Sequence, residues 1–157
     1  MTKELKQEYT LRISEANSTE LVVILYEMLE IYIEEAKNAL NTKDVEVFHE
    51  AIRKCTGCVR ELTASIVKGS ELEGNLTSLY IFCIRELAKA ELHYSASELE
   101  IVEGIIKKLH SAFKVVADND NSPAIMGNTQ RVYAGLTYGK ESLIVHLNQD
   151  SNRGYTI

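Results

Sequence analysis

The segment from Asn17 to Leu40 predicts an α-helix that is apolar around more of its circumference than a surface helix needs. At about 100° per residue, its charged and amide side chains gather in one sector of about 100°. The apolar side chains spread over an arc of about 220°, whereas a helix on the outside of a small bundle needs a stripe of only about 100° or slightly more. The excess needs a second covering surface. The arc contains Leu21, Leu25, Met28, Leu29, Tyr32, Ile33, Ala36 and Leu40.

Helix-breaking residues are scarce before residue 119. The chain has 157 residues, its one proline is Pro123, and half of its eight glycines lie in the last 31 residues. A chain of this length most often forms one domain with a real core. The distribution therefore predicts an all-helical body followed by a tail of a different kind.

Capping signals and apolar periodicity predict four long helices after a short N-terminal helix or turn. The sequence N-S-T-E forms a capping box at Asn17, and S-A-S-E repeats the pattern at Ser95. Because the connections are short, consecutive helices are expected to be antiparallel neighbours. We therefore expect an all-α fold, an antiparallel four-helix bundle with a short N-terminal helix over residues 1–118, and a C-terminal extension over residues 119–157. The expected helices run from Lys3 to Arg12, Asn17 to Leu40, Asp44 to Ile66, Leu72 to His93 and Ser95 to Asp118.

The third long helix has the same excess of apolar surface as the first. Its apolar residues also spread over about 220°, and Phe82 lies outside even that arc. Two plainer interpretations stay open, namely a central position of both helices in the bundle and a homodimer face. The arc contains Leu76, Leu79, Tyr80, Ile81, Cys83, Ile84, Leu87, Ala88 and Leu92.

Composition and charge argue against two classes of partner. A formal net charge of −6 disfavours nucleic acid, because phosphate binding needs clustered Lys and Arg. No uninterrupted apolar run approaches the about 20 residues of a membrane span. The charged start M-T-K-E-L-K-Q-E does not resemble a signal peptide, and three cysteines fit a reducing cytosol. We therefore expect a cytoplasmic protein without a nucleic-acid or membrane partner.

Two short motifs resemble reactive or metal sites, but helix geometry argues against both. Cys55-Thr-Gly-Cys58 falls in the middle of a predicted helix with both sulfurs on the apolar stripe, whereas redox motifs sit at a helix start. Glu46-Val-Phe-His49 lacks the second Glu-x-x-His motif of a di-iron bundle. We expect Cys55 and Cys58 to be reduced core residues, and we predict no catalytic residue, no metal site and no cofactor.

Residues 9–117 resemble the flagellin-specific export chaperone family FliS in the order and spacing of apolar, tyrosine and asparagine residues. The family pattern E-L-x-x-x-L-Y on the first long helix is matched by residues 20–26, E-L-V-V-I-L-Y. The pattern N-L-x-x-L-Y on the third is matched by residues 75–80, N-L-T-S-L-Y. The chain departs from the family at Ser18, where proline is usual, and at Glu91, where asparagine is usual.

The resemblance implies a cytosolic chaperone that binds the C-terminal segment of flagellin, prevents premature polymerisation and delivers the subunit to the flagellar export apparatus. A disordered segment that folds on binding needs a long apolar groove. We expect the two surplus arcs to supply it through Leu21, Leu25, Tyr26, Leu29, Ile33, Leu76, Tyr80 and Ile84. The N-terminal segment is expected to act as a displaceable lid through Leu5, Tyr9, Leu11 and Ile13.

Residues 119–157 are expected to dock on the bundle, because much of this extension is too apolar to stay solvated at low cost. Its apolar residues include Val132, Tyr133, Leu136, Tyr138, Leu143, Ile144, Val145 and Leu147. Two alternatives to an export chaperone stay open. One is a helical interaction module or homodimeric scaffold unrelated to flagella, and the other is a metal or redox bundle built on Cys55, Cys58 and Cys83.

Overall fold

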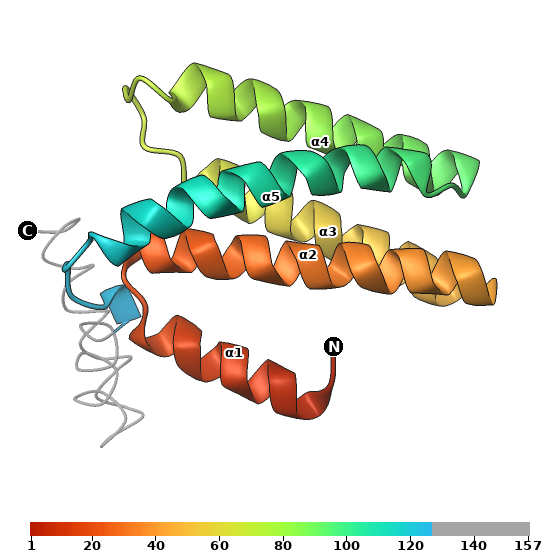
Figure 1. Ribbon diagram of the computed structural model, residues 1–157, viewed down its shortest axis with the longest axis horizontal. Coiled ribbons are helices and arrows are strands. Elements are labelled where there is room, and N and C mark those ends of the chain that lie inside the picture. Colours follow the sequence, from red (N-terminus) through yellow and green to blue (C-terminus); the bar gives the residue numbers. More distant parts are fainter. Residues whose placement is uncertain (127–157) are drawn as a thin grey trace, which may run out of the picture.

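Five helices form the regular structure of residues 1–126, which are the residues that the computed structural model describes. Four long helices run side by side with a short helix beneath them, on the side away from α4 (Figure 1). No strand occurs within residues 1–126, so the expected all-α fold is confirmed. None of these helices is long and apolar enough to cross a membrane. The helices are α1 (Lys3–Glu15), α2 (Ser18–Thr42), α3 (Val45–Ala64), α4 (Glu73–His93) and α5 (Ser97–Asp118).

The four long helices pack as a ring in which α2 and α4 lie diagonally opposite. Both α2 and α4 pack against α3 on one side and α5 on the other. The hydroxyl groups of Tyr26 on α2 and Tyr80 on α4 form a hydrogen bond across the core. This bond satisfies two polar atoms that would otherwise be costly to bury. The largest fully buried side chains around it are Phe48, Leu29, Ile33, Ile52, Leu62, Leu87, Leu99 and Ile106.

The ends of the helices agree with the sequence signals at α2 but not at α5. Asn17 accepts a hydrogen bond from the Glu20 N–H at 2.9 Å, and the Glu20 carboxylate accepts one from the Asn17 N–H at 2.8 Å, which confirms the capping box. The capping box predicted at Ser95 is wrong, because the N-cap of α5 is Ala96 and lacks a side-chain cap. The Ser95 hydroxyl instead donates to the Glu98 carboxylate, which also binds His93.

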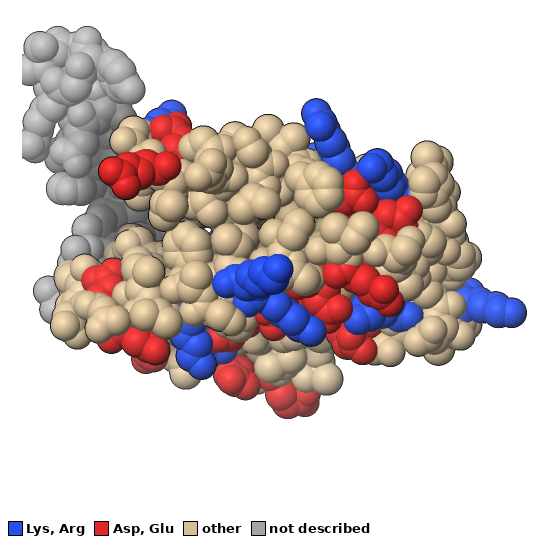
Figure 2. Space-filling view, turned by 45° about the horizontal axis from the view of Figure 1, so that its top comes forward, with Lys and Arg blue, Asp and Glu red and all other residues tan. Residues whose placement is uncertain are grey.

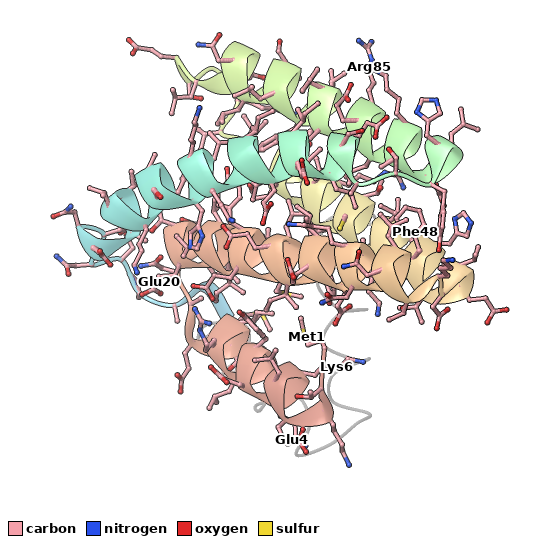
Figure 3. All side chains as sticks on the ribbon, turned by 45° about the vertical axis from the view of Figure 1, so that its right-hand side comes forward. Met1, Glu4, Lys6, Glu20, Phe48 and Arg85 are labelled. Carbon is pink, nitrogen blue, oxygen red and sulfur yellow. The ribbon has the colours of Figure 1, made fainter. Side chains whose placement is uncertain are left out.

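Part of the apolar excess of α2 is covered by α1. Tyr9 of α1 is buried together with Ala16 and Ile24, and Leu21, Met28 and Ile31 of α2 pack around them. Met1 lies between α1 and the long helices, whereas Glu4 lies on the outer side of α1 (Figure 3). α1 therefore covers the face of α2 that points away from the bundle core. The diagonally opposite helix, α4, has no such cover among residues 1–126.

Candidate partner-binding surface

The eight residues predicted to bind a partner do not form one surface. Five of them lie in the bundle core and can touch a partner only if the bundle opens. The other three are partly exposed, but Leu21 and Leu25 lie beside the end of α3, whereas Ile84 lies on α4, across α3 from them. The five core residues are Tyr26, Leu29, Ile33, Leu76 and Tyr80.

One flank of α4 carries exposed apolar residues at helical spacing. We call Ile81, Ile84, Ala88 and Leu92 the α4 stripe, since intervals of three and four residues place them along one side of the helix. Leu92 is 81% exposed and Ile81 is 46% exposed, so both ends of the stripe present large apolar side chains to solvent. Arg85, on the same helix, points away from the bundle (Figure 3).

A shallow depression of about 700 Å³ lies at the C-terminal end of the α4 stripe. Ala88 and Leu92 form one wall, and Val45 at the start of α3 contributes another apolar side chain. The edge is polar, because His49 Nδ1 lies 2.9 Å from a carboxylate oxygen of Glu91. A largely uncharged surface covers the upper helices, with acidic and basic side chains toward its borders (Figure 2).

Tyr94 lines the depression, and its hydroxyl is buried beneath the surface. Its ring packs edge-on against Phe48 at 4.9 Å between ring centroids. Its hydroxyl is buried and makes no hydrogen bond within residues 1–126. Such an atom is costly to leave unsatisfied. The apolar walls and the polar edge together suit one side of an amphipathic helix.

The N-terminal helix is held on α2 by a charged cluster around Glu27. Arg12 donates to both oxygens of the Glu27 carboxylate at 2.6 and 3.0 Å, and the Tyr9 hydroxyl donates at 3.1 Å. Burial by itself raises the pKa of Glu27, but the hydrogen bonds and charge of Arg12 and the Tyr9 hydroxyl outweigh it and lower the pKa. Of the predicted lid residues, Leu5, Tyr9 and Ile13 pack toward α2, whereas Leu11 is 59% exposed.

The cysteines lie in the core, where their chemistry is suppressed. Cys55, Cys58 and Cys83 are buried and free. Burial raises the pKa of Cys58 and of Cys83 to about 11, and it raises the pKa of Cys55 as well. Thiolate is therefore scarce at neutral pH. Within residues 1–126, no group of three His, Cys, Asp or Glu side chains is placed to hold a metal ion.

A helical bundle with an uncovered apolar stripe is the kind of scaffold on which proteins bind helical partners. Comparison with known families agrees with this class, since the family described as "Flagellar protein FliS" matches residues 1–120. The chain belongs to the FliS family of flagellar secretion chaperones.

Two relatives carry the same description. The chain is 30% identical over 105 residues to the flagellar secretion chaperone FliS of Salmonella typhimurium, covering 65% of this chain and 78% of that protein. It is 26% identical over 102 residues to the flagellar secretion chaperone FliS of Bacillus subtilis, covering 65% and 77% respectively. The family match ends at residue 120, so residues 121–157 lie outside the matched part.

Proposed function

We propose that this protein binds the C-terminal segment of flagellin in the cytoplasm, prevents its premature polymerisation and delivers it to the flagellar export apparatus. The observation that carries the proposal is the α4 stripe, in which Ile81, Ala88 and Leu92 are exposed and Ile84 is half-buried. The membership of this protein in a chaperone family supports the same function. In this proposal flagellin binds the α4 stripe, and not the buried residues of α2 and α4 that the sequence pattern predicted as part of the groove.

The dimensions of the α4 stripe match those of a bound helix. From Ile81 to Leu92 it spans twelve residues, or about 16 Å of helix. A partner helix with apolar residues at positions i, i+3 or i+4, and i+7 can lay them along this length. A disordered segment that folds on binding supplies such a helix.

The direct test is binding of purified flagellin with and without its C-terminal segment. We expect intact flagellin to bind this protein at micromolar concentrations or below and the truncated flagellin to lose at least tenfold in affinity, measured by titration calorimetry. Equal affinity of both forms contradicts the proposal. No binding of intact flagellin, together with a stable dimer by analytical ultracentrifugation, favours the alternative of a homodimeric scaffold.

We further propose that α1 is a displaceable cover for the outer face of α2. It packs mainly against α2, and its polar attachments are the cluster at Glu27 and the ion pair of the Met1 ammonium with Glu35. When α1 leaves, the apolar side chains of Ile24, Met28 and Ile31 become available to a partner. A cover that is held by few contacts opens at low cost.

Substitution of Arg12 by Ala tests how α1 is held. A partly exposed ion pair contributes up to about 1 kcal/mol, so we expect amide exchange of α1 to become faster by up to about fivefold. The control is Arg53→Ala, which removes an exposed pair with Glu50 on α3 and should leave α1 unchanged. Docking of α1 should also depend on pH, because the pKa of Glu27 is lower in the folded protein than its ordinary value of 4.5. The ionised Glu27 carboxylate stabilises docked α1 fully above pH 4.5, and this stabilisation is lost as the pH falls through the lowered pKa. Unchanged exchange in Arg12→Ala means that the ion pair of Arg12 with Glu27 does not hold the helix.

A further inference from the structure

Hydrogen bonds attach the chain beyond α5 to the junction between α1 and α2. We call the attached segment, residues 120–125, the strap. The side-chain amide of Asn17 donates to the carbonyl oxygens of Asp120 and Ser122, at 3.2 Å each. The Thr19 hydroxyl donates to the Asp120 carboxylate at 2.7 Å, and the Ile125 N–H donates to the Ala16 carbonyl at 3.1 Å. Asn17 is only 2% exposed, so this attachment is part of the packed structure.

The strap ends at an apolar groove that the described residues leave open. The groove has a volume of about 460 Å³ and lies where α1, the start of α2 and the end of α3 meet. This size is within the range of about 300–1,000 Å³ that ligand pockets occupy. Its lining is mainly apolar and comes from Ile13, Leu21, Val22, Ile24, Leu25 and Ala64, with Ile125 at one edge.

The residues that follow the strap have the composition of an occupant for this groove. Residues 127–131 are polar or glycine, and residues 132–147 contain eight large apolar or tyrosine residues. From Met126 to Val132 the chain can reach at most about 20 Å, and Ile125 already lies at the groove. Arg131 and Lys140 are close in sequence to the apolar residues, and Glu61 lies in the groove wall. A short link also gives the segment a high effective concentration at the groove.

We propose that residues 132–147 of the same chain bind the groove between α1, α2 and α3. The occupied groove covers Leu21, Val22 and Leu25 and holds Ile13, and with it α1, against α2. The extension thereby stabilises the docked position of α1 through apolar contacts, independently of the charged cluster at Glu27. This goes beyond the proposed flagellin binding, because it concerns the free protein and uses a different surface from the α4 stripe.

Methyl-labelled full-length protein without flagellin tests the proposal by nuclear Overhauser effects. We expect contacts from the methyl groups of Val22 and Leu25 to protons of residues 132–147, and the loss of these contacts in the double variant Leu143→Asp, Ile144→Asp. The control is Gln149→Asp, which adds a charge to the extension outside the apolar segment and should retain them.

Three outcomes overturn the proposal. The first is that the Val22 and Leu25 methyl groups show contacts only to residues 1–126. The second is that the contacts persist undiminished in the double variant. The third is that, in a sample mixing labelled and unlabelled chains, the contacts prove to be intermolecular, because the groove is then occupied by the extension of a second copy. Each outcome is read on the free protein and is therefore independent of whether flagellin binds.

Discussion

Replacing Leu29 by Asp is expected to unfold the bundle, although the sequence pattern placed this residue in a binding groove. Leu29 is fully buried in the core of α2, so the substitution removes apolar packing and puts a carboxylate where it cannot be solvated. We expect a loss of at least about 4 kcal/mol in the free energy of unfolding, which is comparable with the whole stability of many domains. Urea unfolding followed by circular dichroism measures it.

The matched control is Leu11→Asp, which places the same charge on α1 at a side chain that is 59% exposed. Its stability should change by less than about 1 kcal/mol. If Leu29→Asp remains folded and only loses affinity for flagellin, Leu29 contacts the partner directly and the bundle must open on binding. The two results separate a core residue from a surface residue without any assumption about the partner.

Replacing both Ile81 and Leu92 by Asp is expected to leave the bundle folded and to weaken flagellin binding at least tenfold. Both side chains are substantially exposed, so neither charge is buried in the free protein. In the complex, both carboxylates would be desolvated against an apolar partner surface. Tenfold corresponds to about 1.4 kcal/mol, which is small compared with the cost of desolvating two carboxylates. Titration calorimetry and a melting curve measure affinity and stability on the same sample.

Val47→Asp is the control for this pair. Val47 is 48% exposed on α3, outside the α4 stripe and its depression. The same change of apolar side chain to carboxylate there should leave the affinity for flagellin within about twofold of the unsubstituted protein. Equal loss in the stripe and control variants points to a general effect of negative charge on binding. No loss in either variant removes the α4 stripe from the binding surface.

The number and order of the helices follow from local features of the sequence. Apolar periodicity and the scarcity of breakers were enough for five helices, because both act within a few turns of one helix. The capping box at Asn17 also followed from local geometry. The observed helix ends differ from the predicted ones: α3 ends at Ala64 rather than Ile66, and α1 continues to Glu15 rather than stopping at Arg12. Helix ends fray, so the sequence specifies their exact residues less sharply than the helices themselves.

The location of the surplus apolar surface was decided by tertiary structure alone. A helical wheel shows how wide an apolar arc is, but it cannot show which part of the arc faces the core. Tyr26 and Tyr80 come from two such arcs and meet in the core, where each satisfies the hydroxyl of the other. The rest of the α2 arc is covered only in part by α1, since Leu21 and Leu25 line the groove at the end of α3, and Ile81 and Leu92 of α4 stay exposed.

The sequence by itself therefore determined an all-α fold, the family resemblance and two helices with more apolar surface than the core requires. The expected docking of the extension concerns residues of which 127–157 lie outside the described part, and only the strap at residues 120–125 is seen to attach. Which arc is covered within the chain, and which is left for a partner, depends on how α1 and α4 pack against elements distant in the sequence. Such long-range packing leaves no local periodic signal, so it appeared only in the folded chain.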